Sequence, residues 1–280
     1  MARLRFTDDP TSRLAIWARR LALFALAATL LSIIVVRSGF LEIEPSLATF
    51  GGALVFAALA ILTGLAAFVT IWKDGLNGLG HAVLAIAIGG LLLIYPGYLG
   101  VKAYRLPAIS DVTTDPIDPP RFEAIARVRP RGANPVIYAG LYAAEQQRRA
   151  YPEIEPLLLS VPPKTAFDAA LTVANKRRWR VIDTRDLTPG RAEGRIEAVA
   201  RTPVMGFRDD IVIRVRPAPD GSRVDVRSAS RYGRHDFGAN AARIRSLLDD
   251  IDDIAVPPVE KVDKKKPPPG KGQKAQAPKR

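Results

Sequence analysis

Residues 210–230 read DIVIRVRPAPDGSRVDVRSAS, two runs of alternating apolar and polar residues on either side of a turn. Strict alternation is typical of a β-strand with one apolar and one polar face, because successive side chains point to opposite sides. Between the runs, the pair Asp220-Gly221 favours a tight turn, since both residue types tolerate the backbone conformation that hairpins need. The stretch therefore predicts an antiparallel hairpin with strands at about 210–216 and 223–230.

Two more strands and two helices are predicted on either side of this hairpin. Residues 179–184 and 195–202 show the same alternation, whereas 165–177 and the stretch from Gly238 to Asp252 carry apolar residues at helical spacing. We therefore expect an α+β soluble domain at residues 107–254, in which an antiparallel sheet of about four strands packs with two or more helices.

Proline punctuates the entry into this domain, at Pro116, Pro119 and Pro120. Because proline lacks a backbone N–H and interrupts helices, most of residues 107–161 should be extended and packed on the domain surface. Within it, residues 139–149 are expected to form a short helix.

Residues 21–101 are almost free of charge and differ sharply from the rest. Apolar stretches at about 16–37, 47–71 and 81–101 reach the ~20 residues that cross a bilayer as a helix. We therefore predict three transmembrane helices within residues 21–101. The first stretch has the basic flank of a signal peptide, but Val35-Val36-Arg37-Ser38 lacks the small residues of a cleavage site, which favours a retained anchor.

The distribution of basic residues predicts the orientation in the membrane, because Lys and Arg gather on the cytoplasmic side. Residues 1–20 hold five arginines, whereas the loop after the first span holds Arg37 beside Glu42 and Glu44. We predict a cytoplasmic basic arm at residues 1–20. Three spans then place the soluble domain and the C-terminus in the periplasm, anchored to the inner (plasma) membrane.

Small residues recur at contact spacing in the second and third spans, as in Ala60-x-x-x-Gly64 and Ala85-x-x-x-Gly89. Such pairs let helices approach closely in lipid. Packing within one chain accounts for them, and dimerisation through the transmembrane helices is the alternative. Arg19, Arg20 and Arg37 lie near the ends of the first span, and no Asp, Glu, Lys or Arg within the membrane interior marks an ion or proton path. This argues against a transporter.

The net charge of +13 lies mostly at the two ends of the chain. It therefore does not describe a nucleic-acid-binding face, and no nucleic-acid partner is expected. Residues 255–280 are rich in Lys and Pro, without an aromatic residue, and are predicted to be a disordered tail. Weak attraction of the tail to anionic envelope components and a purely solubilising role are both open. The absence of cysteine excludes disulfides and thiolate chemistry.

Several linked motifs in the soluble domain resemble one bacterial family. They are Asp111-Val-Thr-Thr-Asp115 with Pro119-Pro120, Tyr151-Pro-Glu-Ile154, Thr202-Pro-x-x-Gly206-Phe-x-Asp-Asp210, Gly221-Ser-Arg-Val-Asp-Val-Arg-Ser-x-Ser-Arg231 and Gly233-x-x-Asp236-x-Gly238-x-Asn240-Ala-x-Arg243-Ile244. With them the chain resembles the domain of unknown function 1499 family over about Asp111 to Asp252. That family has no assigned activity, so the resemblance supports the domain boundaries and implies no chemistry.

Arginines on the polar face of the sheet form a candidate anion-binding face. Its members are Arg214, Arg216, Arg223, Arg227 and Arg231, with Arg243 in the following helix. Guanidinium groups bind phosphate or carboxylate in bidentate fashion, and an anionic envelope component would supply either. The alternative is cross-strand pairing with Glu197, Asp210 and Asp225 on a solvated face, which needs no ligand.

A hydrolase site built from Ser228, Ser230, His235 and Asp236 is disfavoured. Neither serine lies in the Gly-x-Ser-x-Gly turn that exposes a nucleophile, and Asp236 adjoins the histidine that it would have to orient. We expect Asp236 to cap a turn instead.

A metal site built from Asp209, Asp210, Asp225 and Asp236 is also disfavoured. Carboxylate oxygens suit hard cations, but the spacing matches no metal-binding loop and arginines adjoin these residues. No catalytic residue, metal or cofactor is therefore predicted.

Together these features predict an inner-membrane-anchored envelope protein. Its periplasmic domain would act as a non-enzymatic binding or interaction module for an anionic envelope component or a partner protein, besides the lipid bilayer itself. The alternative is an enzyme acting on an envelope lipid or glycan. A pocket with a carboxylate or histidine aimed at open space would favour the enzyme.

Overall fold

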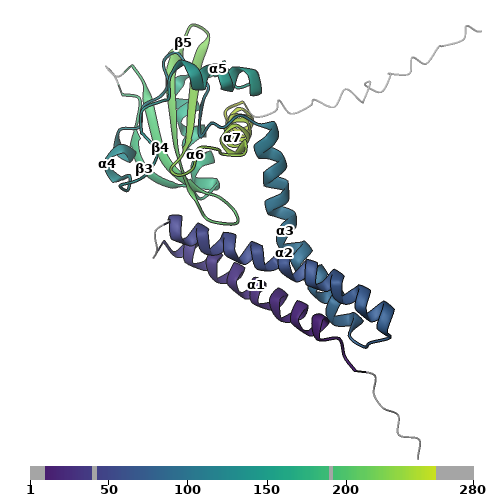
Figure 1. The fold of residues 1–280 in the computed structure, drawn as a ribbon. Helices are drawn as coiled ribbons and strands as arrows, with labels where there is room; N and C mark the ends of the chain where they lie inside the picture. Colours follow the sequence, from purple (N-terminus) through teal and green to yellow (C-terminus); the bar gives the residue numbers. More distant parts are fainter. Residues whose placement is uncertain (1–9, 40–42, 189–191, 257–280) are drawn as a thin grey trace, which may run out of the picture.

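The computed structural model describes residues 10–39, 43–188 and 192–256, and consists of three long helices followed by a sheet domain at residues 107–256 (Figure 1). The helices are α1 (Arg13–Ser38), α2 (Ile43–Asp74) and α3 (Leu79–Arg105). By length and composition, all three are long and apolar enough to cross a membrane. Each extends beyond its predicted span of 16–37, 47–71 or 81–101, because the helical backbone continues past the apolar stretch.

Glycines in α2 and α3 hold these two helices close together. A Cβ on Gly64 would lie 2.9 Å from the Ile86 side chain, and one on Gly89 would lie 2.8 Å from the backbone oxygen of Ala57. Only a residue without a side chain fits at such a crossing. The two small-residue motifs of the sequence therefore serve packing within one chain.

The sheet has six antiparallel strands, and β3 to β6 are the four that the sequence predicts. They are β1 (Asp111–Thr113), β2 (Leu157–Leu159), β3 (Arg180–Arg185), β4 (Gly194–Arg201), β5 (Arg208–Ala218) and β6 (Gly221–Ser230). The strand order is β1-β6-β5-β4-β3, and β2 also pairs with β6. The additional strands β1 and β2 have three residues each, which is too short for an alternating pattern to identify them.

Two helices cover one face of the sheet, α6 (Pro163–Lys176) and α7 (Ala239–Ala255) (Figure 1). Ile196, Ile213 and Val226 lie opposite one another on β4, β5 and β6, and they form the core together with side chains from both helices. Because α7 includes Ala255, the predicted tail begins inside a helix. The remainder of that tail, residues 257–280, lies outside the described residues.

The segment between β1 and β2 covers the other face of the sheet. It contains the short helices α4 (Ala124–Val128) and α5 (Leu141–Ala150). Phe122 and Ile125 from this segment pack with side chains of β4, β5 and β6. The polar face is therefore largely buried, and the expectation of a solvated face was wrong: extended, proline-rich chain is enough to cover a sheet.

The sheet domain contacts the end of α1 and the end of α3. Arg37, in the last turn of α1, donates to the carbonyl oxygens of Pro203 (2.6 Å) and Val204 (3.0 Å) in the β4–β5 loop. The start of α1 lies at the other end, where Ser12 N–H donates to the Asn77 carbonyl between α2 and α3 (2.8 Å). The sheet domain is thus joined to the end of α1 that is remote from its start, as three spans require.

Candidate functional site

Three of the five candidate arginines surround one buried carboxylate, that of Asp225 on β6. Arg216 Nη2 lies 2.8 Å and Arg214 Nη2 3.1 Å from Asp225 Oδ2, while Arg223 Nε lies 2.8 Å from Oδ1. Register places Arg214 directly opposite Asp225 across β5 and β6. The predicted alternation, which placed these side chains on one face, is confirmed. Asp225, the first carboxylate that neutralises them, belongs to the sheet itself.

Two further carboxylates reach the same arginines from the covering segment. Asp115 Oδ2 accepts from Arg223 Nη2 at 2.8 Å, and Asp118 Oδ2 accepts from Arg214 Nη1 at 3.0 Å. Three arginines and three aspartates therefore form one balanced cluster. Oppositely charged groups at these distances satisfy one another, so the cluster holds no spare positive charge for an anionic ligand.

Arg227 is satisfied by Asp111 of β1 and by a different part of the covering segment. Its guanidinium makes a bidentate pair with Asp111 (3.0 and 2.6 Å), donates to the carbonyl oxygens of Pro120 and Val136, and stacks on the Phe122 ring at 4.6 Å. The side chain is 3% exposed. Arg227 therefore binds the segment to β6.

Arg231, the fifth candidate, shares a buried aspartate with a residue of the covering segment. Its Nε donates to Asp210 Oδ1 at 2.8 Å, and Arg129 Nε lies 2.8 Å from Asp210 Oδ2. Arg243 lies on the opposite face, where it contacts Asp209, Ser228 and Asn240. Each candidate arginine thus has a carboxylate partner, as expected if these arginines form ion pairs within the chain and bind no ligand.

Glu197 pairs with no arginine of the described residues, although the sequence suggested such a pair. Its carboxylate accepts three backbone N–H groups at the start of α4, from Glu123 (2.9 Å), Ala124 (3.1 Å) and Ile125 (2.8 Å). The first N–H groups of a helix lack partners within the helix and attract negative charge. This fully buried glutamate of β4 therefore holds the covering segment against the sheet.

The hydrolase candidates are occupied by structural hydrogen bonds. Ser228 Oγ donates to Asn240 Oδ1 (2.8 Å) and accepts from Arg243 Nη1 (2.9 Å). His235 Nδ1 accepts the Phe237 N–H at 2.9 Å, so the ring proton sits on Nε2, 3.1 Å from the Leu106 carbonyl oxygen. The imidazole therefore joins the sheet domain to the end of α3 and faces neither serine.

Asp236 caps the turn before α7, as the sequence predicts. It accepts the backbone N–H groups of Gly238 (2.8 Å) and Asn240 (2.9 Å). Burial raises the pKa of this carboxyl despite both donors. Among residues 10–39, 43–188 and 192–256, no group of three or more His, Cys, Asp or Glu side chains is placed to hold a metal ion.

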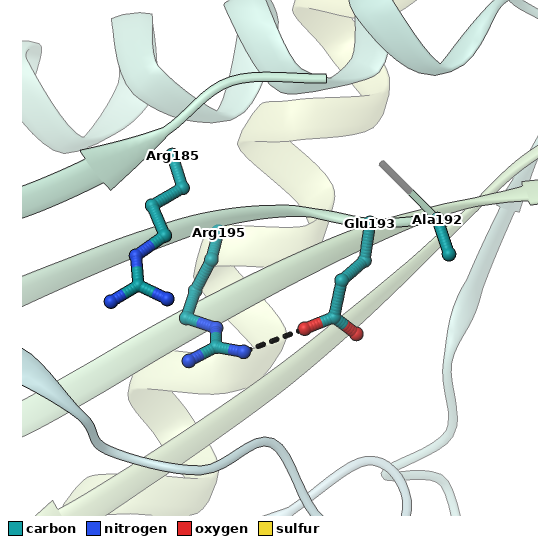
Figure 2. A pocket seen from close by; sticks show the side chains of 4 residues that line it. All are labelled: Arg185, Ala192, Glu193 and Arg195. Atoms are coloured by element: carbon teal, nitrogen blue, oxygen red, sulfur yellow. Dashed lines mark hydrogen bonds and ion pairs between the residues drawn. The ribbon is translucent and has the colours of Figure 1, made fainter. Parts of the chain in front are cut away.

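A small polar pocket opens beside β3 and β4, with a volume of about 260 Å³ (Figure 2). Arg185 and Arg195 extend into it from these neighbouring strands, and Glu193 accepts from Arg195 Nη2 at 2.7 Å. Both arginines also pair with Glu123 from the covering segment. Carboxylates therefore neutralise this pocket as well.

A larger groove of about 650 Å³, here termed the Ile137 groove, lies within the covering segment. It is lined by residues 116–119, 121, 122, 136–138, 140 and 141, together with Arg227. The side chains of Ile117, Ile137 and Leu141 are 97%, 85% and 90% exposed. Sequence analysis missed this groove; the available signal was large apolar residues in a proline-rich stretch that was expected to lie at the surface.

Tyr138 is the one buried side chain of the Ile137 groove whose polar atom lacks a hydrogen-bond partner in the described residues. Its ring stacks against the Arg227 guanidinium at 5.6 Å. Burial raises the pKa of its hydroxyl to about 12. An aromatic ring and a neutralised guanidinium thus form the floor beneath the apolar rim.

A family model described as protein of unknown function (DUF1499) matches residues 111–251, which is half of the chain. The matched region begins at β1 and ends within α7, so it includes the whole sheet and its covering segment. No curated protein and no solved structure matches the chain.

Proposed function

The chain belongs to the DUF1499 family, and we propose that it is a membrane-anchored, non-enzymatic binding module whose periplasmic sheet domain binds a partner protein through the Ile137 groove. The family description carries no activity, so the proposal is argued from this chain alone.

The anchoring and the orientation are supported by the helices and by the basic residues. Three helices have the length and composition of membrane spans. Five arginines precede residue 21, and the sheet domain contacts the end of α1 that is remote from them. Basic residues gather on the cytoplasmic side, so the sheet domain belongs to the periplasm.

The observation that carries the binding role is the exposed rim of the Ile137 groove. Ile117, Ile137 and Leu141 each expose at least 85% of their surface around one hollow. Burying a large aliphatic side chain contributes about 1.5–3 kcal/mol. A partner that covers these three side chains would therefore gain a substantial binding free energy. Clustered apolar side chains beside a concave surface are typical of a protein-binding site.

The location of the groove favours a partner protein over the membrane. Leu141 is the first residue of α5, and Figure 1 places α5 at the end of the sheet domain farthest from α1 and α2. The floor favours an uncharged contact, because Asp111 already neutralises Arg227. An apolar side chain of a partner protein therefore fits this groove better than an anionic headgroup.

The non-enzymatic part of the proposal is supported by the polar side chains. Ser228 is held by hydrogen bonds with Arg243 and Asn240. Both ring nitrogens of His235 are engaged with the backbone. A nucleophile needs an adjacent base with a free lone pair, and neither residue offers that pairing.

Site-specific photo-crosslinking in native membranes tests the proposal. A photoreactive residue replaces Ile137 or Leu141 in the full chain, and Leu158 of β2, which is 70% exposed, serves as the matched control. We expect a discrete protein adduct at the two groove positions and none at Leu158, with the adduct lost when Ile117→Asp is added. Equal adducts at all three positions, or adducts to lipid alone, would contradict the proposal.

A further inference from the structure

Two arginines at the ends of β4 and β5 differ from the five arginines of the candidate anion-binding face. Arg201 and Arg208 lie directly opposite each other in the antiparallel register, and both are exposed. Among the described residues neither has a carboxylate within ion-pairing distance, whereas Arg214, Arg216, Arg223, Arg227 and Arg231 all do. The positive charge of this end of the sheet is therefore not balanced.

Like charges directly opposite each other on neighbouring strands destabilise a sheet. Arg216 and Arg223 are also direct cross-strand partners. In that pair the repulsion is offset, because both arginines bind Asp225. No such aspartate serves Arg201 and Arg208 among the described residues. An anion from outside the chain would take the place that Asp225 has in the other pair.

The position of Arg201 and Arg208 near the end of α1 indicates what kind of anion would bind them. Arg208 Nη2 lies 3.6 Å from where a Cβ on Gly39 would be, and Gly39 is the residue that ends α1. Arg37, in the last turn of α1, is exposed and donates to the carbonyls of Pro203 and Val204, and it has no carboxylate partner among the residues that the structure describes. The end of a membrane-spanning helix lies at the depth of the lipid headgroups.

We propose that Arg37, Arg201 and Arg208 form a headgroup site that binds the phosphate of an anionic phospholipid in the adjoining leaflet. Guanidinium groups bind phosphate in a bidentate geometry. Arg37 and Arg208 lie at the end of α1, and Arg201 lies beside Arg208 on the neighbouring strand. The bound lipid relieves the repulsion between the two strands and holds the β4–β5 loop against the membrane. This site is separate from the Ile137 groove, and its test does not depend on a partner protein.

Lipid retention by the purified full chain in nanodiscs tests the headgroup site. Nanodiscs of phosphatidylcholine containing graded amounts of phosphatidylglycerol are exchanged with the protein, and native mass spectrometry counts the phosphatidylglycerol that stays bound. The test variant is Arg201→Gln/Arg208→Gln. Its control is Arg127→Gln/Arg148→Gln, which removes the same charge from two exposed positions, in α4 and α5.

We expect the test variant to lose apparent affinity for phosphatidylglycerol by about fivefold per arginine, or about 25-fold in all, because each basic residue near an anionic surface contributes about 1 kcal/mol. The control should retain the wild-type affinity. Equal losses in the two variants would show nonspecific charge attraction and overturn the proposal.

Two further measurements distinguish a bound lipid from a free anion and from a purely structural role of the arginines. Millimolar inorganic phosphate should not displace the phosphatidylglycerol; displacement would assign the site to a free anion and overturn the proposal. In pure phosphatidylcholine, where no anionic lipid offsets the repulsion between Arg201 and Arg208, the melting temperature of the test variant should equal or exceed that of its control. A lower melting temperature of the test variant there would show that the arginines only complement the C-terminus of α1, and would also overturn it.

Discussion

Arg37 Nη1 lies 2.6 Å from the carbonyl oxygen of Pro203, a hydrogen bond between the last turn of α1 and the loop that joins β4 to β5. The loop is shaped for this contact. Gly206 has a φ of +71°, and a Cβ there would lie 3.0 Å from Arg37 Cγ. The motif Thr202-Pro-x-x-Gly206-Phe therefore contacts a helix that lies outside the family match.

Replacing Arg37 should loosen this loop. Hydrogen bonds from charged groups contribute about 1.5–3 kcal/mol, so Arg37→Ala should accelerate amide hydrogen exchange of residues 202–207 by about tenfold or more. Hydrogen-exchange mass spectrometry in nanodiscs measures this. Arg148→Ala, at an exposed site in α5, should leave the exchange of the loop unchanged. Unaltered exchange in Arg37→Ala would show that the contact does not order the loop.

The orientation predicts a specific pattern of reporter activity. A reporter that is active only in the periplasm should function when it is fused after Pro107, because three spans separate this point from the basic N-terminus. The same reporter fused after Asp74, at the end of α2, should be inactive. The reverse pattern would place the sheet domain in the cytoplasm and remove the periplasmic part of the proposed function.

Residues 107–256 should fold without the three helices. The core between the sheet and the helices α6 and α7 is built from residues of this fragment, and so are the balanced ion pairs of the polar face. Only single contacts, such as those of Arg37 and Leu106, are lost. Urea unfolding of the fragment should show one cooperative transition, by circular dichroism and by tryptophan fluorescence alike. A gradual, noncooperative change would refute the boundary.

Glu197→Gln should destabilise that fragment strongly. The substitution removes the charge and one of two oxygens that accept three buried N–H groups at the start of α4. Leaving buried donors without partners costs about 1–3 kcal/mol, and more for a charged group. The control Glu145→Gln removes a surface pair with Arg149 and should change the unfolding free energy by less than about 0.5 kcal/mol. Similar effects of the two substitutions in urea unfolding would contradict this account.

Alkaline pH should unfold the fragment partly through two tyrosines. Burial raises the pKa of Tyr138 and Tyr151 in the folded state to about 12, from the ordinary value of 10. Between these values the unfolded chain has lost the proton that the folded chain keeps, so stability falls as pH rises through this window. Absorbance at 295 nm should show a late ionisation phase that shrinks in Tyr138→Phe and not in Tyr142→Phe, the exposed neighbour.

Tyr138→Phe should not reduce stability at neutral pH. The hydroxyl is buried without a partner among the described residues, so removing it eliminates a desolvation cost. We expect an unfolding free energy that is unchanged or up to about 1 kcal/mol higher, measured in urea. A clear loss of stability would show that the hydroxyl has a partner after all.

Much of this fold could be predicted from alternation alone. The strands β4, β5 and β6 alternate over their length, whereas β3 has a register shift between Val181 and Asp183. Ile213 and Arg214 face the sides that the pattern assigns. What alternation could not show is which face is solvated, since a covering segment without periodicity leaves no pattern. For this reason the buried arginines were expected at an exposed surface.

The two proposed binding surfaces were missed for a related reason. Nothing in the sequence distinguishes Arg201 and Arg208 from other arginines. What matters is that neither has a carboxylate partner among the described residues. Ile137 and Leu141 belong to a segment whose composition predicts only that it is extended. Both surfaces depend on long-range neighbours, which composition and spacing do not encode.

The ion pairs of the polar face also set the order in which this protein can be made. Arg227 binds Asp111, 116 residues earlier, and Arg214 binds Asp118, 96 residues earlier. The aspartates leave the ribosome well before the arginines that neutralise them, and β1 cannot pair until β6 exists. The domain therefore cannot complete its fold until β6 has been synthesised, which leaves this long-range pairing as the slow step of folding.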